Sequence, residues 1–130
     1  MVASSSSSTA RYYRTYRTDL RFLIKHALLC SKGVATVEVL LYGATVISWQ
    51  SSPPDSTEQK EHLFVSSKAA LDGSKPVRGG IPIVFPCFGQ PTLEAHKGLP
   101  QHGYARNSKW AYSGTPRLDN DDGVVVELSE

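Results

Sequence analysis

The stretch that most constrains the fold is VATVEVLLYG, residues 34–43, where β-branched and other apolar residues crowd together and a glycine ends the run. β-Branched side chains favour extended backbone, and glycine commonly closes such a run. Residues 45–50, TVISWQ, repeat the pattern directly afterwards. We therefore predict a strand at residues 34–42, followed either by the second strand of a two-stranded ribbon or by the continuation of one sharply bent strand.

The rest of the chain is also dominated by short strand patterns. Polar segments rich in proline and glycine separate further predicted strands at residues 62–66, 109–113 and 123–128. Residues 81–86, IPIVFP, contain two prolines that cannot donate ladder hydrogen bonds, which favours an edge or a buried irregular segment. Residues 19–28 have apolar positions at helical spacing behind Asp19 and predict a short helix or an irregular lead-in. These patterns predict an all-β sandwich or barrel.

Unpaired strand edges are expected in this chain. The last predicted strand ends two residues before the end of the chain. Five or six strands with unmatched apolar faces would expose long unpaired edges. We expect that partner strands are missing.

Length and charge exclude several classes of protein. The 130 residues suit one domain, and 14 basic against 12 acidic residues give a net charge of only +2. Five of the basic residues lie within residues 1–30, so the remainder carries no excess of positive charge and does not indicate a nucleic-acid partner. The longest uncharged apolar stretch is too short to cross a bilayer, so no membrane association is predicted.

The first 18 residues differ in composition from the rest. They contain a run of five serines and three arginines but no acid, which predicts a disordered head, with an organellar transit peptide as the alternative. Residues 19–130 are predicted to form the folded part. Cys30 and Cys87 have neither a metal-ligand spacing nor a disulfide framework, so we expect reduced thiols, a cytoplasmic location and no metal site.

Two glycine-flanked polar motifs carry most of the candidate chemistry. RGGIPIVFPCFG spans residues 78–89 and LPQHGYARN spans residues 99–107. Arg78 and Arg106 supply two guanidinium forks that suit a phosphate or a carboxylate. Gln101 and His102 supply neutral donors and acceptors of the kind that bind sugar hydroxyls. A surface ion pair for each arginine and a structural role for His102 are the alternatives.

These motifs belong to a wider resemblance. Residues 33–128 resemble the N-terminal portion of the glucose-6-phosphate 1-epimerase family, which are hexose-6-phosphate mutarotases of the aldose 1-epimerase superfamily. Four blocks carry the resemblance in order: LLYGATVISW at 40–49, LFVSSKA at 63–69, RGGIPIVFP at 78–86 and LPQHGYARN at 99–107.

The resemblance implies a fold and an activity. The fold is a partial antiparallel β-sandwich of the galactose-mutarotase type, with its C-terminal strands missing from this chain. The activity is an isomerase reaction that interconverts the α and β anomers of hexose 6-phosphates by acid–base ring opening. The residues implied to contact the sugar phosphate are Arg78, Gln101 and Arg106, with His102 lining the pocket. The resemblance implies no metal, no organic cofactor and a monomeric full-length form.

The catalytic groups are expected elsewhere. In the family the catalytic histidine and glutamate lie further along the chain than residue 130, so we expect no catalytic residue in this sequence and no activity of the chain alone. The alternative is a non-catalytic sugar-phosphate-binding or interaction fragment that another chain completes across its open strand edges.

Overall fold

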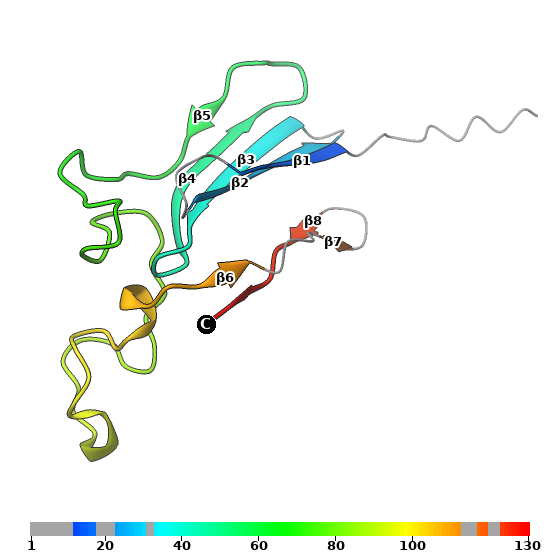
Figure 1. Cartoon of the computed structure of the whole chain (residues 1–130). Coiled ribbons are helices and arrows are strands. Elements are labelled where there is room, and N and C mark those ends of the chain that lie inside the picture. The colour runs from blue at the N-terminus through cyan, green and yellow to red at the C-terminus, as the bar shows by residue number, and fades with distance from the viewer. Residues whose placement is uncertain (1–11, 18–22, 31–32, 113–116, 120–122) are drawn as a thin grey trace, which may run out of the picture.

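The computed structural model describes residues 12–17, 23–30, 33–112, 117–119 and 123–130, and it is built mainly of antiparallel strands (Figure 1). Residues 1–11 and residue 18 of the head predicted to be disordered lie outside this part, whereas Tyr12–Arg17 of the same head forms a strand. The strands are β1 Tyr12–Arg17, β2 Leu23–Cys30, β3 Gly33–Leu40, β4 Thr45–Ser52, β5 Lys60–Glu61, β6 Ala111–Tyr112, β7 Arg117–Asp119, β8 Gly123–Val125 and β9 Leu128–Ser129.

The first five strands form one sheet in the order β1-β2-β3-β4-β5, with every neighbouring pair antiparallel. The register between β3 and β4 shifts between Glu38 and Val39, which marks a β-bulge. Gly43 and Ala44 form the turn between these strands, and both have positive φ, at 72° and 46°. Of the two alternatives predicted for residues 34–50, the structure shows the two-stranded ribbon and not one sharply bent strand.

The lead-in to this ribbon differs from the helix predicted at residues 19–28. Leu23–Cys30 forms β2 instead and pairs residue by residue with Gly33–Leu40. The spacing of apolar residues fits both periods over so short a segment, and hydrogen bonding to the neighbouring strand decides the outcome. Both predicted alternatives, the short helix and the irregular lead-in, are wrong over residues 23–28, and residues 19–22 lie outside the described residues.

The middle of the chain is mostly loop. The strand predicted at residues 62–66 is reduced to the short β5 before it and an isolated bridge between Val65 and Gly79. Residues 81–86 contribute only isolated bridges at Ile81 and Phe85, so the segment is irregular as predicted. The prediction that it is buried is wrong, because Ile81, Val84 and Phe85 are exposed. Two 3-10 turns, η1 Glu94–His96 and η2 Ala105–Asn107, are the helical elements of the described residues.

The end of the chain adds two small ladders, β6 with β9 and β7 with β8. All the ladders are antiparallel, so the all-β class is confirmed. No helix in the described part of the chain is long and apolar enough to cross a membrane.

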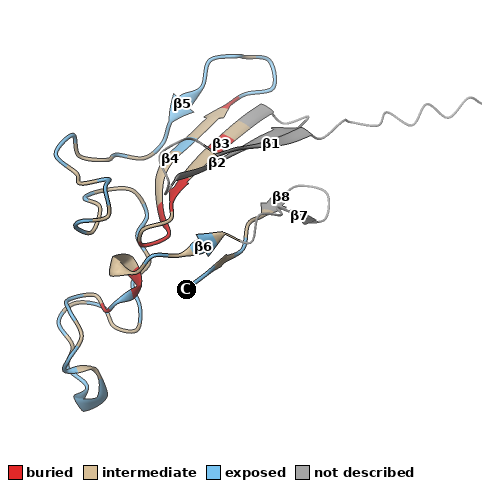
Figure 2. Cartoon of the chain, in the orientation of Figure 1, coloured by how far each residue is buried: buried red, intermediate tan, exposed pale blue. Residues whose placement is uncertain are grey.

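The best-buried residues gather around the turn between β3 and β4. Leu40, Ala44 and Thr45 are buried there, and Ala105 is buried in the loop that meets this turn (Figure 2). Large apolar side chains elsewhere among the described residues are exposed: Trp49, Phe64, Leu71, Ile81, Val84, Phe85, Phe88, Leu93 and Tyr104. Among the residues whose burial is described, the best-buried side chains therefore lie where the loops contact the sheet.

Candidate functional site

The segment that carries Arg78 is fixed by its two following glycines. On one side the N–H of Ser66 donates to the Arg78 carbonyl at 2.9 Å, and the N–H of Gly80 donates to the Phe64 carbonyl at 2.8 Å. A Cβ atom on Gly79 would overlap the Phe64 carbonyl oxygen, and its φ of 112° also requires glycine. The backbone beside Arg78 therefore lies closer to residues 64–66 than a residue with a side chain at position 79 would allow.

The other side of the same segment pairs with the start of β4. Ile81 and Val46 exchange two backbone hydrogen bonds, of 2.9 and 3.1 Å. A Cβ atom on Gly80 would overlap the Val46 carbonyl oxygen. The two glycines thus let residues 78–81 lie between two other segments, which holds the Cα of Arg78 in place while its side chain stays exposed.

Arg106 lies in η2, against the turn between β3 and β4. A Cβ atom on Gly43 would be 2.6 Å from the Arg106 carbonyl oxygen, and the N–H of Gly43 donates to the Ser108 carbonyl at 2.7 Å. One guanidinium nitrogen, Nη2, donates to the Gln101 carbonyl at 2.8 Å. The Nε atom is buried and has no hydrogen-bond partner among the described residues. Arg106 therefore bonds to its own loop through Nη2, and its guanidinium has further N–H groups that can donate to another acceptor.

Gln101 and His102 lie at a turn of the same loop. The side chain of Gln101 is exposed, and His102 is half-buried with a φ of 68°. The N–H of Gly89 donates to Nδ1 of His102 at 3.0 Å, and the Phe88 ring lies edge-on to the imidazole with a centroid separation of 4.9 Å. The imidazole is therefore held from two directions.

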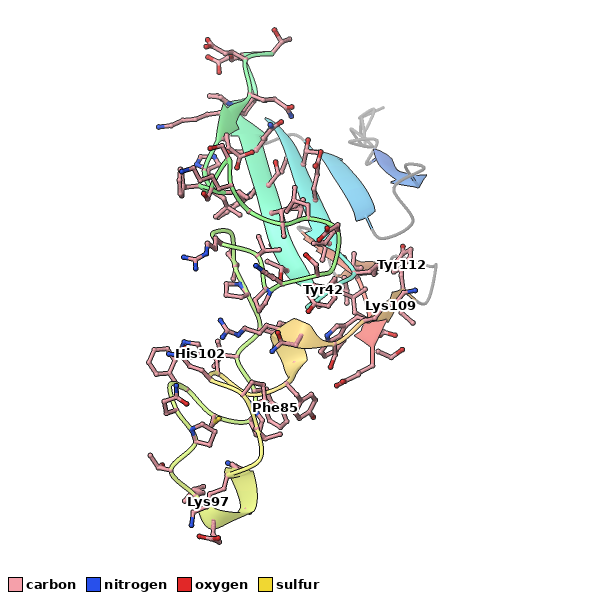
Figure 3. The ribbon with its side chains drawn as sticks, turned by 60° about the vertical axis from the view of Figure 1, so that its left-hand side comes forward. Tyr42, Phe85, Lys97, His102, Lys109 and Tyr112 are labelled. Atoms are coloured by element: carbon pink, nitrogen blue, oxygen red, sulfur yellow. The ribbon has the colours of Figure 1, made fainter. Side chains whose placement is uncertain are left out.

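Residues 85–89 and 101–105 run side by side (Figure 3). The Phe85 carbonyl accepts from the N–H of Tyr104 at 3.0 Å and, more weakly, from that of Ala105 at 3.4 Å. A Cβ atom on Gly103 would overlap the same carbonyl. The indole N–H of Trp110 donates to the Ala105 carbonyl at 3.0 Å. The two hydrogen bonds to the Phe85 carbonyl connect the loop bearing Gln101, His102 and Arg106 to the proline-rich segment. The Trp110 bond fixes the end of that loop.

The two arginine segments are attached to one short stretch of chain. Residues 78–81 pair with Val46, and residues 106–108 pack on Gly43. Three residues span at most about 10 Å even when fully extended, and Gly43 and Ala44 lie in a turn, so the two backbone attachment points are close together. No carboxylate contacts either guanidinium among the described residues, and the alternative of a surface ion pair for Arg78 or Arg106 is not seen there. Two cationic forks so arranged suit an anion.

The predictions missed two glycines that build this site. The sequence marks Gly43 only as the end of a strand and assigns no part to Gly89, although both contact a candidate residue. Gly89 closes the segment FPCFG, and that flanking glycine is the one signal that could have marked it.

A second polar cluster, away from these four residues, fastens β5 to β4. The Glu61 carboxylate accepts from the Ser48 hydroxyl at 2.6 Å and from the N–H groups of Trp49 and Leu63 at 3.0 and 2.9 Å. These hydrogen bonds, that of Ser48 foremost, lower the pKa of Glu61 from 4.5 to about 2. The carboxylate is fully engaged by its own sheet edge, which favours a structural part for it.

Comparison with known proteins gives related sequences that share one name. Three relatives named "Putative glucose-6-phosphate 1-epimerase" are 46% identical over 79 residues (Cenchrus ciliaris), 35% over 88 (Salmonella typhimurium) and 33% over 86 (Escherichia coli K12). The matches cover 61%, 68% and 66% of this chain. They cover only 21%, 27% and 26% of the relatives, so this chain corresponds to about a quarter of each.

A solved structure supports the same relationship. The crystal structure of HI1317 superposes with a TM-score of 0.55 and 25% sequence identity, over 90% of this chain and 41% of that one. This likeness confirms the predicted fold class, a partial antiparallel β-sandwich of the galactose-mutarotase type. The sequence signature of aldose 1-epimerase matches residues 25–130. Because that match spans more than half of the sequence, the chain belongs to the aldose 1-epimerase family.

Proposed function

We propose that the chain is the sugar-phosphate-binding portion of a glucose-6-phosphate 1-epimerase, an isomerase that interconverts the α and β anomers of hexose 6-phosphates. The observation that carries the proposal is the attachment of the Arg78 and Arg106 segments to the same stretch, residues 43–46. The names of the three relatives support the same substrate class. The domain proposed is residues 19–130, as the N-terminal part of a mutarotase-like β-sandwich.

The proposed roles follow from the chemistry of each side chain. Arg78 and Arg106 hold the phosphate through charge-assisted hydrogen bonds, and Gln101 and His102 bind sugar oxygens. Holding the phosphate at one end fixes the anomeric carbon at the other end for proton transfer. Ring opening needs one group that takes the proton of the anomeric hydroxyl and one that protonates the ring oxygen. We assign neither group to residues 1–130.

The phosphate role can be tested by isothermal titration of the full chain with glucose 6-phosphate and with glucose. Arg78→Ala is expected to weaken binding of the phosphate ester about 10- to 100-fold, because it removes a hydrogen-bonding cation. Lys68→Ala is the matched control, since it removes an exposed cation that has no part in the proposed site. Equal affinity for glucose and glucose 6-phosphate would contradict the proposal.

The isomerase part is tested separately. Saturation transfer between the two anomeric protons of glucose 6-phosphate measures the rate of interconversion directly. We expect binding without acceleration by residues 1–130, and acceleration by a longer form that contains the acid and the base. We also expect a cytoplasmic location, where hexose phosphates are metabolised, and a monomeric longer form.

A second candidate is a non-catalytic sugar-phosphate-binding or interaction fragment. It is favoured by side chains such as Phe64 and Phe88, which are 78% and 85% exposed. The partner would be a polypeptide that carries the remaining strands of the sandwich, since this chain covers only 41% of HI1317. Sedimentation and urea unfolding separate the two candidates, because a monomer that unfolds cooperatively would count against the fragment.

A further inference from the structure

Gly89 and His102 join two loops through a reciprocal contact. The N–H of His102 donates to the Gly89 carbonyl at 2.8 Å, and the N–H of Gly89 donates to the Nδ1 atom of His102 at 3.0 Å. Both residues have positive φ, 74° and 68°, which turns the two backbones toward each other. The imidazole is therefore fixed at its Nδ1 edge by the main chain of the neighbouring loop.

This contact determines which nitrogen of the ring carries the proton. A neutral imidazole has one N–H donor and one bare acceptor nitrogen. Because Nδ1 accepts the Gly89 N–H, it is the bare nitrogen, and the proton is on Nε2. No described residue accepts a hydrogen bond from Nε2. His102 thus presents an unused donor.

Two contacts restrain the imidazole ring. The Phe88 ring packs edge-on to it, with an interplanar angle of 63°. Turning the ring over would remove Nδ1 from the Gly89 N–H and lose that hydrogen bond. Within its own loop, Nη2 of Arg106 donates to the carbonyl of Gln101, the residue directly before His102, which restrains the backbone there.

We propose that the backbone N–H of Gly89 is a positioning group that fixes His102 as the Nε2–H tautomer, so that His102 donates a hydrogen bond to a sugar oxygen of a bound hexose 6-phosphate. This inference rests on the proposed function and deepens it. In this arrangement His102 is a donor to the ligand and is not the group that takes the proton of the anomeric hydroxyl.

The tautomer can be measured without any ligand. Long-range ¹H–¹⁵N spectra of the full chain, labelled at histidine nitrogens, distinguish a protonated nitrogen from a bare one. We expect His102 to show a bare Nδ1 and a protonated Nε2. A protonated Nδ1 in the neutral ring, or an even mixture of tautomers, would overturn the inference whatever the chain binds.

Binding of glucose 6-phosphate to substituted chains tests the donor. His102→Asn keeps a side-chain oxygen near the position of Nδ1 but has no donor at the position of Nε2, so binding should weaken about fivefold. His102→Gln places an amide N–H near the position of Nε2 and should recover part of that loss. His96→Asn makes the same change at a histidine outside the site and should leave binding unchanged.

The outcomes separate this inference from the proposed function. If binding depends on Arg78 while His102→Asn binds like the unsubstituted chain, the donor role is wrong and the phosphate role stands. If the chain binds no sugar phosphate at all, the proposed function fails and the ligand role of Nε2 fails with it. Binding that shifts the Nε2–H resonance and weakens in His102→Asn supports both.

Discussion

Two groups of loops in this molecule are built in opposite ways. In the loop junction, which comprises residues 41–46, 64–66, 78–81, 85–89 and 101–110, backbone segments distant in sequence hydrogen-bond to one another. In the outer loop, residues 90–100, the backbone bonds are local, such as those from His96 to Leu93 and from Leu99 to His96. Lys97, at the tip of the outer loop, lies far from Tyr42, Lys109 and Tyr112 (Figure 3).

The glycines express the difference most clearly. A Cβ atom on Gly79, Gly80 or Gly103 would overlap a carbonyl oxygen of another segment, whereas one on Gly98 in the outer loop, or on Gly89 at the edge of the junction, would have no atom within 4 Å. The junction is therefore held by close backbone contact, and the outer loop by its own short turns. The candidate residues all lie in the junction, so their positions depend on the tighter of the two constructions.

Alanine at Gly103 tests this comparison most severely. Gly103→Ala forces a Cβ atom against the Phe85 carbonyl and puts alanine at a φ of 75°, which should cost about 3 kcal/mol or more of unfolding free energy. Gly98→Ala, the matched change in the outer loop, should stay within about 0.5 kcal/mol of the unsubstituted chain. Urea unfolding measures both, and similar losses at the two positions would refute the distinction.

Loss of one side-chain hydrogen bond inside the junction should lower the unfolding free energy less than the backbone change at Gly103. Trp110→Phe removes the indole N–H that donates to the Ala105 carbonyl, and a lost hydrogen bond of this kind costs about 1 kcal/mol. Trp49→Phe is the control, since Trp49 is 46% exposed and its indole makes no hydrogen bond to the described residues. Equal stability of the two variants would show that the indole tie contributes nothing.

The sheet edge should give the smallest effect, and it should depend on pH. The pKa of Glu61 is lowered from 4.5 to about 2, so its contribution to stability is present above pH 4.5 and is lost as the pH falls toward 2. Hydrogen exchange at the Trp49 and Leu63 amides, which donate to this carboxylate, should quicken over that interval relative to junction amides. In Glu61→Gln that acid-dependent difference should disappear, and its persistence would assign it to another group.

The sequence predicts the ribbon well because its information is local. The β-branched residues of 34–42 and the glycine at 43 define both strands and the turn between them. It fails at Leu23–Cys30, since an apolar spacing compatible with two structures is decided by pairing to Gly33–Leu40. A period read along one segment contains no information about the partner strand.

The site divides in the same way. The residue types of Arg78 and Arg106 suit an anion, those of Gln101 and His102 suit sugar hydroxyls, and the resemblance assigns all four to a sugar-phosphate site. What the sequence does not contain is the contact of Gly43 with Arg106 or of Gly89 with His102, because each joins positions well apart along the chain. Such contacts depend on backbone approach in three dimensions, which leaves no periodic pattern.

The local bonding of the outer loop has a practical consequence. Because the backbone hydrogen bonds of residues 93–99 are local, a dye or an immobilisation tag attached at position 98 would disturb no hydrogen bond of the junction. The chain can then be fixed to a sensor surface through this turn while the arginine segments remain attached to β4. A chain immobilised in this way would let the proposed binding of sugar phosphates be measured directly at a sensor surface.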